Sequence, residues 1–140
     1  MCSDSRFTAL GINHSVVLRT TRRNAKIVIG SDIGVSGGTI CAEQSIIIGN
    51  ECLIGANVTL VDNDFHAITA NGRRFNNNES DISAAPVVIS NNVFLGAQSI
   101  ILKGVVVGEN SIVGAGTILT SNVDADVVVA GSPTKIIKKL

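Results

Sequence analysis

A six-residue period of aliphatic side chains is the feature that most constrains how this chain can fold. In the second half of the sequence an aliphatic residue recurs at every sixth position without a slip, and a small or β-branched residue follows four positions after each one. The aliphatic series is Ile89, Leu95, Ile101, Val107, Val113 and Leu119. The accompanying series is Val93, Ser99, Val105, Ser111, Thr117 and Val123. A run of this length indicates an internal repeat.

The first half of the chain carries the same pattern with one interruption. The aliphatic series is Ile29, Val35, Cys41, Ile48, Ile54 and Leu60, with one extra residue before Ile48. The accompanying series is Ile33, Thr39, Ser45, Cys52, Val58 and Asp64. Asp64 is the first residue of this series that breaks the pattern, because it is charged and is neither small nor β-branched. We therefore expect the repeat to stop near this residue.

A period of six fits neither a helix of 3.6 residues per turn nor a simple alternating strand. It fits a short strand followed by a turn. Three such units make a triangular coil of about 18 residues, and coils stack about 4.8 Å apart, so that the aliphatic positions form inward-facing ladders. The composition agrees, because hydrophobic content is 45%, aromatic content only 3%, and 14 residues are glycine. The sequence predicts an all-β solenoid forming a single domain over residues 1–140.

Composition and charge also narrow the classes of partner. Eleven basic and eleven acidic residues cancel, and no basic stripe suggests nucleic acid binding. No apolar run approaches 18 residues, so we expect no membrane span, and the lack of a signal sequence makes a cytoplasmic location the default. Cys2, Cys41 and Cys52 show no metal-binding spacing, and the last two are expected to be small buried thiols.

Residues 62–86, "DNDFHAITANGRRFNNNESDISAAP", interrupt the solenoid. They are polar, rich in asparagine and without the six-residue period, so we expect them to leave the stack as one long excursion loop. A long loop in a compact domain is usually functional or mobile. The loop begins with two carboxylates and His66, which makes His66 the candidate for chemistry. The other histidine, His14, precedes the repeats and has no motif around it.

Two segments, "DNDFHAI" and the C-terminal "VGAGTILTSNVDADVVVAGSPTKIIKKL", resemble the hexapeptide-repeat acyltransferases. The resemblance extends over residues 17–140 and points in particular to sugar and surface-polysaccharide O-acetyltransferases related to maltose and galactoside acetyltransferases. It implies a left-handed parallel β-helix with a short C-terminal helix, although the usual crossover preference is right-handed. It also implies a homotrimer that binds acetyl-coenzyme A between neighbouring subunits, without a metal. Flat apolar faces of the coil would suit such threefold packing.

The resemblance assigns His66 as the catalytic base. Acetyl transfer from a thioester to a sugar hydroxyl requires removal of the hydroxyl proton, and histidine can accept this proton near neutral pH. Direct attack in a ternary complex suffices, so no covalent intermediate is expected. Asp62 and Asp64 are candidates to orient the imidazole or to bind substrate. The alternative interpretation is that both residues form turns or solvate the loop.

The resemblance also transfers a coenzyme site onto this chain. Small residues would let the pantetheine arm approach, polar residues follow the last ladder position, and basic residues would meet the adenosine-side phosphates. The corresponding positions are Gly96, Ala115, Thr120, Ser121, Lys135 and Lys138. The family often has arginine at the last two positions, and lysine lacks the bidentate guanidinium fork. The segment "KIIKKL" is also readable as an amphipathic helix with Ile136, Ile137 and Leu140 packed.

The acceptor side is marked only by isolated residues. Glu43 is a candidate contact for a sugar hydroxyl. Arg73 and Arg74 in the loop could contact a phosphate or carboxylate of the acceptor, or simply be solvated. We therefore expect an acetyl-CoA-dependent O-acetyltransferase of a sugar or polysaccharide precursor.

Other readings remain open. One is N-acetylation of an amino sugar or antibiotic on the same scaffold, and another is a non-catalytic β-helix assembly module. A carbonic anhydrase of this fold would need three histidines, whereas this chain has two.

Overall fold

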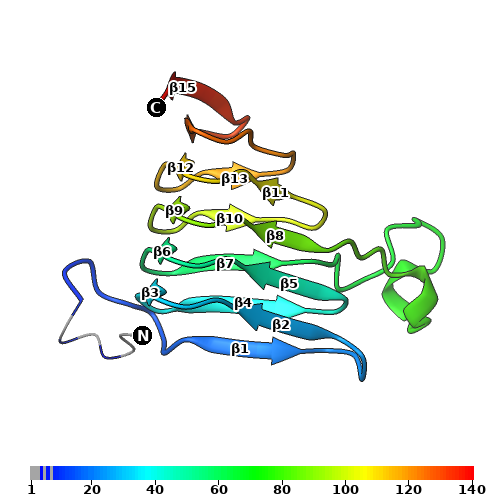
Figure 1. Cartoon of the computed structure of the whole chain (residues 1–140). Coiled ribbons are helices and arrows are strands. Elements are labelled where there is room, and N and C mark those ends of the chain that lie inside the picture. Colours follow the sequence, from blue (N-terminus) through cyan, green and yellow to red (C-terminus); the bar gives the residue numbers. More distant parts are fainter. Residues whose placement is uncertain (1–3, 5, 7) are drawn as a thin grey trace.

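The computed structural model describes residues 4, 6 and 8–140. The chain is an all-β solenoid of about 6 turns, and three sheets, parallel except for the last strand pair β14–β15, form the sides of a prism (Figure 1). The first sheet contains β1 (Val17–Thr20), β4 (Gly38–Ala42), β7 (Val58–Val61), β10 (Ile100–Ile101) and β13 (Ile118–Leu119). The second contains β2 (Lys26–Ile29), β5 (Ser45–Ile48), β8 (Val87–Ile89) and β11 (Val106–Val107). The third contains β3 (Gly34–Val35), β6 (Leu53–Ile54), β9 (Phe94–Leu95), β12 (Ile112–Val113), β14 (Val127–Ala130) and β15 (Lys135–Lys139).

The predicted aliphatic ladders form the core. In the third sheet Val35 pairs with Ile54, Ile54 with Leu95, and Leu95 with Val113. All four side chains are at most 5% exposed. Each coil therefore places its inward side chain directly above that of the coil below, and burial of apolar surface accumulates along the stack.

Two ladder positions differ from those predicted. Ile40, not Cys41, pairs with Leu60 and fills the inward position of β4. The corner before it is one residue shorter because Gly37 and Gly38 adopt positive φ values, whereas the next corner is longer. At the other end Val123 pairs with Val107 and is itself a ladder residue, rather than the companion of the preceding one.

The corners of the prism share a left-handed backbone conformation. The third residue after an inward ladder position has φ between 54° and 62° in seven coil corners, at Asp32, Glu51, Asn57, Asn92, Gln98, Asn110 and Asp126. Asparagine, aspartate and glycine tolerate this conformation best. Glycine occurs directly after a ladder residue for a different reason, which is the close approach of the next coil. A Cβ on Gly96 would lie 2.5 Å from the backbone nitrogen of Ala115 in the next coil.

The long excursion leaves the stack where predicted. β7 ends at Val61 and β8 begins at Val87, and the intervening loop projects from the prism edge between the first and second sheets (Figure 1). Two short 3-10 helices, η2 (Arg73–Phe75) and η3 (Glu79–Asp81), are its only helical elements. The loop is thus a separate surface attached to a rigid stack.

The predicted C-terminal helix is wrong, because Lys135–Lys139 form strand β15. After a turn, β15 pairs antiparallel with β14 and covers the edge that β14 would otherwise expose. Ile136, Ile137 and Leu140 are not packed as an amphipathic helix would have them; they are 58%, 61% and 55% exposed. β-Branched Ile-Ile next to an unpaired strand edge explains the preference for a strand.

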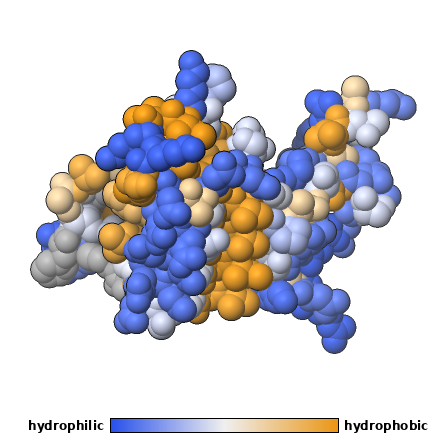
Figure 2. Space-filling model, turned by 45° about the horizontal axis from the view of Figure 1, so that its top comes forward, coloured by the Kyte–Doolittle hydropathy of each residue, from blue (hydrophilic) through white to orange (hydrophobic). Residues whose placement is uncertain are grey.

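An apolar band runs along the outside of the second sheet (Figure 2). It contains Val28, Ile47, Val88 and Val106, which are register partners in successive strands and which we call the outer aliphatic column. Val28 and Val106 at its ends are 46% and 39% exposed. Within the described part of the chain, no helix has the length and apolar character needed to cross a membrane.

Candidate active site

The neck of the excursion loop is closed by backbone pairing. Asn63 and Ala84 form an antiparallel bridge, the N–H of Asp64 donates to the carbonyl of Ser83 (3.0 Å), and the N–H of Ala85 donates to the carbonyl of Asp62 (2.8 Å). These contacts join the two ends of the loop before it opens. The residues immediately beyond the neck are therefore held close to the rigid stack.

His66 follows this neck on a tight turn. Phe65 has φ of 59°, and its N–H donates to the side-chain oxygen of Asn63 (2.8 Å). The N–H of His66 then donates to the carbonyl of Asp64 (2.7 Å). The turn directs His66 outward, and the residue is exposed. A short polar segment thus presents the imidazole beside the stack rather than at the tip of the loop.

Asp62 is fully buried and belongs to the scaffold. Its carboxylate oxygens accept hydrogen bonds from the backbone N–H groups of Glu43 and Gln44, both at 2.7 Å, and from the side-chain amide of Asn63 at 3.1 Å. These bonds satisfy the longer corner between β4 and β5, where the extra residue of the first half is accommodated. Asp62 is enclosed by the scaffold, so its carboxylate is not exposed to bind a substrate or to orient the imidazole.

Asp64 is held by Lys103 of the following coil. The Lys103 ammonium donates to both carboxylate oxygens, at 2.7 and 2.8 Å, and both side chains are partly buried. Among the hydrogen bonds of the described residues, neither Asp62 nor Asp64 contacts the ring of His66. The two carboxylates fix the turn that carries the imidazole and do not pair with it directly.

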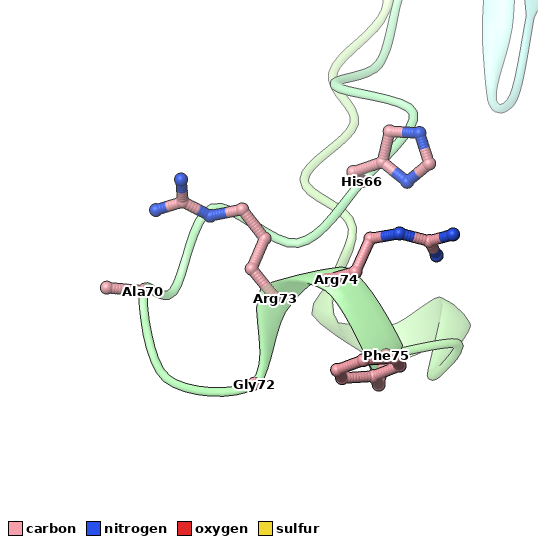
Figure 3. Close-up of a pocket in the computed structure, with 6 residues that line it drawn as sticks. All are labelled: His66, Ala70, Gly72, Arg73, Arg74 and Phe75. Carbon is pink, nitrogen blue, oxygen red and sulfur yellow. The ribbon is translucent and has the colours of Figure 1, made fainter.

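An open pocket of about 730 Å³ lies beside His66. Its other lining residues, all from the loop, are Ala70, Gly72, Arg73, Arg74 and Phe75 (Figure 3). The Arg73 guanidinium donates to the carbonyl of Ile68 (2.6 Å), and the Arg74 guanidinium lies 5.8 Å from the centre of the Phe75 ring. The pocket combines a proton-accepting group, two cations and an aromatic ring.

Glu43 is engaged by a residue that the sequence analysis did not single out. The Arg22 guanidinium pairs with Glu43 at 2.8 Å and also with Glu79 of the loop. These residues surround a smaller cavity of about 200 Å³ with Phe65 and Ile82. Arg22, which follows β1, thus ties the loop to the stack from one side, and Lys103, which follows β10, ties it from the other. The signal for the pairing of Arg22 with Glu43 lies in the register of the strands, because Thr20 and Ala42, which precede these two residues, are partners in neighbouring coils.

The predicted coenzyme residues fall into two groups. Gly96 and Ala115 are in contact on the edge between the third and first sheets. Ser121 and Lys135 line a common cavity of about 100 Å³ near the C-terminal end. Lys135 and Lys138 pair with Ala130 and Val128 of β14, on either side of a bulge, so their side chains share its outward face. Thr120 is exposed beside Ser121.

The remaining reactive groups are structural. Burial raises the pKa of both Cys41 and Cys52, which are 6% and 0% exposed, so neither is an activated thiolate. Among residues 4, 6 and 8–140 no three His, Cys, Asp or Glu side chains lie close enough to hold a metal ion. Cys2 lies outside the described residues. His66 is thus an exposed titratable side chain that lines the pocket together with Arg73 and Arg74.

Sequence comparison identifies the repeat. Residues 27–61 and 86–121, just over half of the chain, match the family model of the hexapeptide repeat of succinyl-transferase. The galactoside O-acetyltransferase of Escherichia coli (strain K12) is 34% identical over 105 residues, which are 73% of this chain and 48% of that protein. The 2,3,4,5-tetrahydropyridine-2,6-dicarboxylate N-acetyltransferase of Staphylococcus aureus (strain JH9) is 53% identical over 57 residues, or 41% of this chain and 24% of the relative.

Solved structures share the fold. A galactoside acetyltransferase in complex with coenzyme A superimposes with a TM-score of 0.74 at 31% identity, covering 87% of this chain and 58% of the other. A polysialic acid O-acetyltransferase gives 0.75 at 30% identity, covering 89% and 59%. The chain spans about half the length of the galactoside O-acetyltransferase that it matches. With its six-residue ladders and its matched repeat blocks, this chain belongs to the hexapeptide-repeat acetyltransferase family.

Proposed function

We propose that this chain is an acetyl-CoA-dependent O-acetyltransferase that transfers an acetyl group to a hydroxyl of a sugar or polysaccharide precursor. The observation that carries the proposal is the placement of His66. In a chain of this family, the loop that interrupts the repeats presents an exposed imidazole at its base, on a braced turn beside an open pocket. The similarity to galactoside and polysialic acid O-acetyltransferases supports a saccharide acceptor.

In this mechanism the acceptor hydroxyl attacks the thioester carbonyl carbon while His66 accepts the hydroxyl proton. The tetrahedral adduct collapses with cleavage of the C–S bond, and the imidazolium returns the proton to the departing thiolate. The products are the acetyl ester and coenzyme A. A backbone N–H near the thioester would stabilise the developing oxyanion. Because Asp64 and Lys103 brace the turn, the imidazole enters the reaction from a fixed backbone position.

The coenzyme is proposed to lie along the later coils. Gly96 and Ala115 would let the pantetheine arm approach the backbone, and Thr120 and Ser121 would donate hydrogen bonds. Lys135 and Lys138 would pair with the phosphates as point charges. Support comes from the shared outward face of the two lysines and from the cavity that joins Ser121 to Lys135.

We also propose a left-handed coil and a homotrimer with the site between subunits. The outer aliphatic column is the observation that supports the trimer, because a continuous, partly exposed apolar band on a flat sheet is typical of an interface. Val106→Glu should dissociate the trimer in sedimentation equilibrium and abolish activity. Val17→Glu is the matched control, since Val17 is 40% exposed and Val106 is 39% exposed but Val17 lies on another sheet. A trimeric Val106→Glu variant would exclude this interface.

The direct test of the reaction is a thiol-release assay with acetyl-CoA and a panel of sugars. His66→Ala should lower kcat by about 10²–10⁴-fold, the usual contribution of general base catalysis. Calorimetric binding of coenzyme A should be retained, because the imidazole is not placed in the coenzyme site. His14→Ala is the control, since His14 is also exposed but lies before the first strand. Full activity of His66→Ala would reject the mechanism.

N-acetylation is the second candidate. The specific observation in its favour is the 53% identity to an N-acetyltransferase over 57 residues. Amine acceptors, including amino sugars, therefore belong in the same panel. A higher kcat/KM for an amine than for the matched hydroxyl compound would favour this alternative. If the chain folds into the stack and forms the trimer but binds no coenzyme A, this outcome would instead indicate a non-catalytic module.

A further inference from the structure

The pocket beside His66 is positively charged without an internal counter-ion. Its lining contains two guanidinium groups, from Arg73 and Arg74, and no carboxylate. Two like charges close together on a short helical turn repel each other. An arrangement of this kind is stabilised when an anion enters the pocket.

The carboxylates of the loop do not supply that anion, because each is engaged elsewhere. Asp62 accepts two backbone N–H bonds, Asp64 pairs with Lys103, and Glu79 pairs with Arg22. Asp81 accepts a hydrogen bond from the side-chain amide of Asn76 at 2.8 Å. Each of these four carboxylates is thus bound to a backbone N–H group, to a cation of the stack or to Asn76, and none of them lines the pocket.

The two arginines are not equivalent. Arg73 is held by its hydrogen bond to the carbonyl of Ile68, and its side chain extends away from the imidazole (Figure 3). Arg74 extends on the same side of the loop as the ring of His66 (Figure 3). Among the described residues the Arg74 guanidinium has no hydrogen bond or ion pair, and its one close partner is the Phe75 ring at 5.8 Å. Its planar fork of donors is free to bind a carboxylate or phosphate.

We propose that the acceptor is anionic: a saccharide that carries a carboxylate or phosphate close to the hydroxyl to be acetylated, with Arg74 as the ligand of that anion. The inference rests on the proposed acetyltransferase function and specifies its substrate class. Arg74 fixes the acceptor through its charge and orients the neighbouring hydroxyl toward His66. Phe75 supports the guanidinium through its ring. Arg73 holds the backbone of the loop and does not select the acceptor.

The test compares matched sugars in the thiol-release assay: galactose, galacturonate and galactose 1-phosphate, and the corresponding glucose series. We expect kcat/KM to be about 10- to 100-fold higher for at least one anionic member than for its neutral parent, the value of one hydrogen-bonded charge contact. The two anionic arms distinguish a carboxylate site from a phosphate site. Equal or better use of the neutral sugars would overturn the inference and leave the acetyltransferase function standing.

Two variants assign the contact. Arg74→Gln should lower the ratio of kcat/KM for the anionic sugar to kcat/KM for its neutral parent to about one, whereas Arg73→Gln should keep the ratio of the unsubstituted chain. Arg74→Lys keeps the charge but loses the fork, so it should restore only part of the preference. A preference that survives Arg74→Gln, or that is lost equally in Arg73→Gln, would contradict the assignment.

A binding measurement separates failure of the inference from failure of the proposed reaction. Galacturonate and galactose are titrated by calorimetry into the coenzyme A-loaded His66→Ala protein, in which no transfer competes. Binding of galacturonate that depends on Arg74 supports the anionic site even if no sugar is acetylated, an outcome that would reject the proposed reaction alone. Equal binding of the two sugars would overturn the anionic site.

Discussion

Replacement of Asp62 by alanine should destabilise the fold more than any other change to a loop carboxylate. Asp62 is fully buried, and its two oxygens accept the N–H groups of Glu43 and Gln44 at 2.7 Å each. These donors belong to the longer corner between β4 and β5, which has no other described partner for them. The variant therefore leaves two backbone N–H groups without an acceptor and loosens the neck of the loop.

The magnitude follows from the two donors. An unsatisfied buried donor costs about 1–3 kcal/mol, and more when its partner was charged. Gln44 is exposed and Glu43 partly buried, so water reaches the freed amides and places the loss at the lower end, about 2–3 kcal/mol in total. Asp62→Asn keeps one acceptor oxygen and should cost about half as much. Against a typical stability of 5–15 kcal/mol, either loss is readily measured.

Urea unfolding followed by far-UV circular dichroism is the suitable assay, because the chain contains no Trp or Tyr for intrinsic fluorescence. Protein concentration must be the same for all variants, since assembly would add to the apparent stability. Asp81→Ala is the control, as this exposed carboxylate of the same loop accepts only side-chain and local bonds. Asp62→Ala within about 0.5 kcal/mol of the unsubstituted chain would refute the assigned role.

Three further predictions concern the stack, the braced turn and the buried thiols. Gly96→Ala should lower the free energy of unfolding by about 1–3 kcal/mol, because the new Cβ would meet backbone of the next coil at 2.5 Å; an unchanged urea midpoint would contradict this close approach. Lys103→Met should lower kcat more than it raises KM, because releasing Asp64 frees the turn that carries the base, and Lys103→Arg should restore part of the rate in the same steady-state assay. Burial raises the pKa of Cys41 and Cys52 above the ordinary 9.0, so the folded chain keeps thiol protons that the unfolded chain releases. The contribution of the two thiols to the free energy of unfolding should be fully present below that pH and should fall as the pH rises above it. A variant with both cysteines replaced by alanine should therefore show a smaller change of the urea midpoint between pH 8 and 10.

The left-handed corners carry a second signal in the sequence, besides the aliphatic ladders. Asp32, Asn57, Asn92 and Asn110 each stand three residues after a ladder position, where the backbone requires positive φ. They recur at this position because Asn and Asp tolerate the left-handed conformation better than other residues that carry a side chain. Read together with the ladders, these residues mark the corners that follow Ile29, Ile54, Ile89 and Val107.

The site was predictable only in outline. The break in the period located the loop and His66, because a segment without inward residues cannot remain in the stack. The partners of the loop were not predictable from local pattern, since Arg22, Lys103 and Asp62 act across coils. Their roles depend on which corners lie one above another. Placing Lys103 beside Asp64 requires the register in which Leu60 pairs with Ile101.

The sequence by itself determined the stacked coils and the point where they are interrupted, because inward apolar residues every six positions can be buried together in only one kind of arrangement. Tertiary structure decided what local preference left open. The C-terminal lysine-rich segment became a strand because the edge of β14 offered unpaired hydrogen-bonding groups. Likewise Asp62 became a buried scaffold residue rather than a substrate ligand, because two backbone donors of a distant corner lie within reach of its carboxylate.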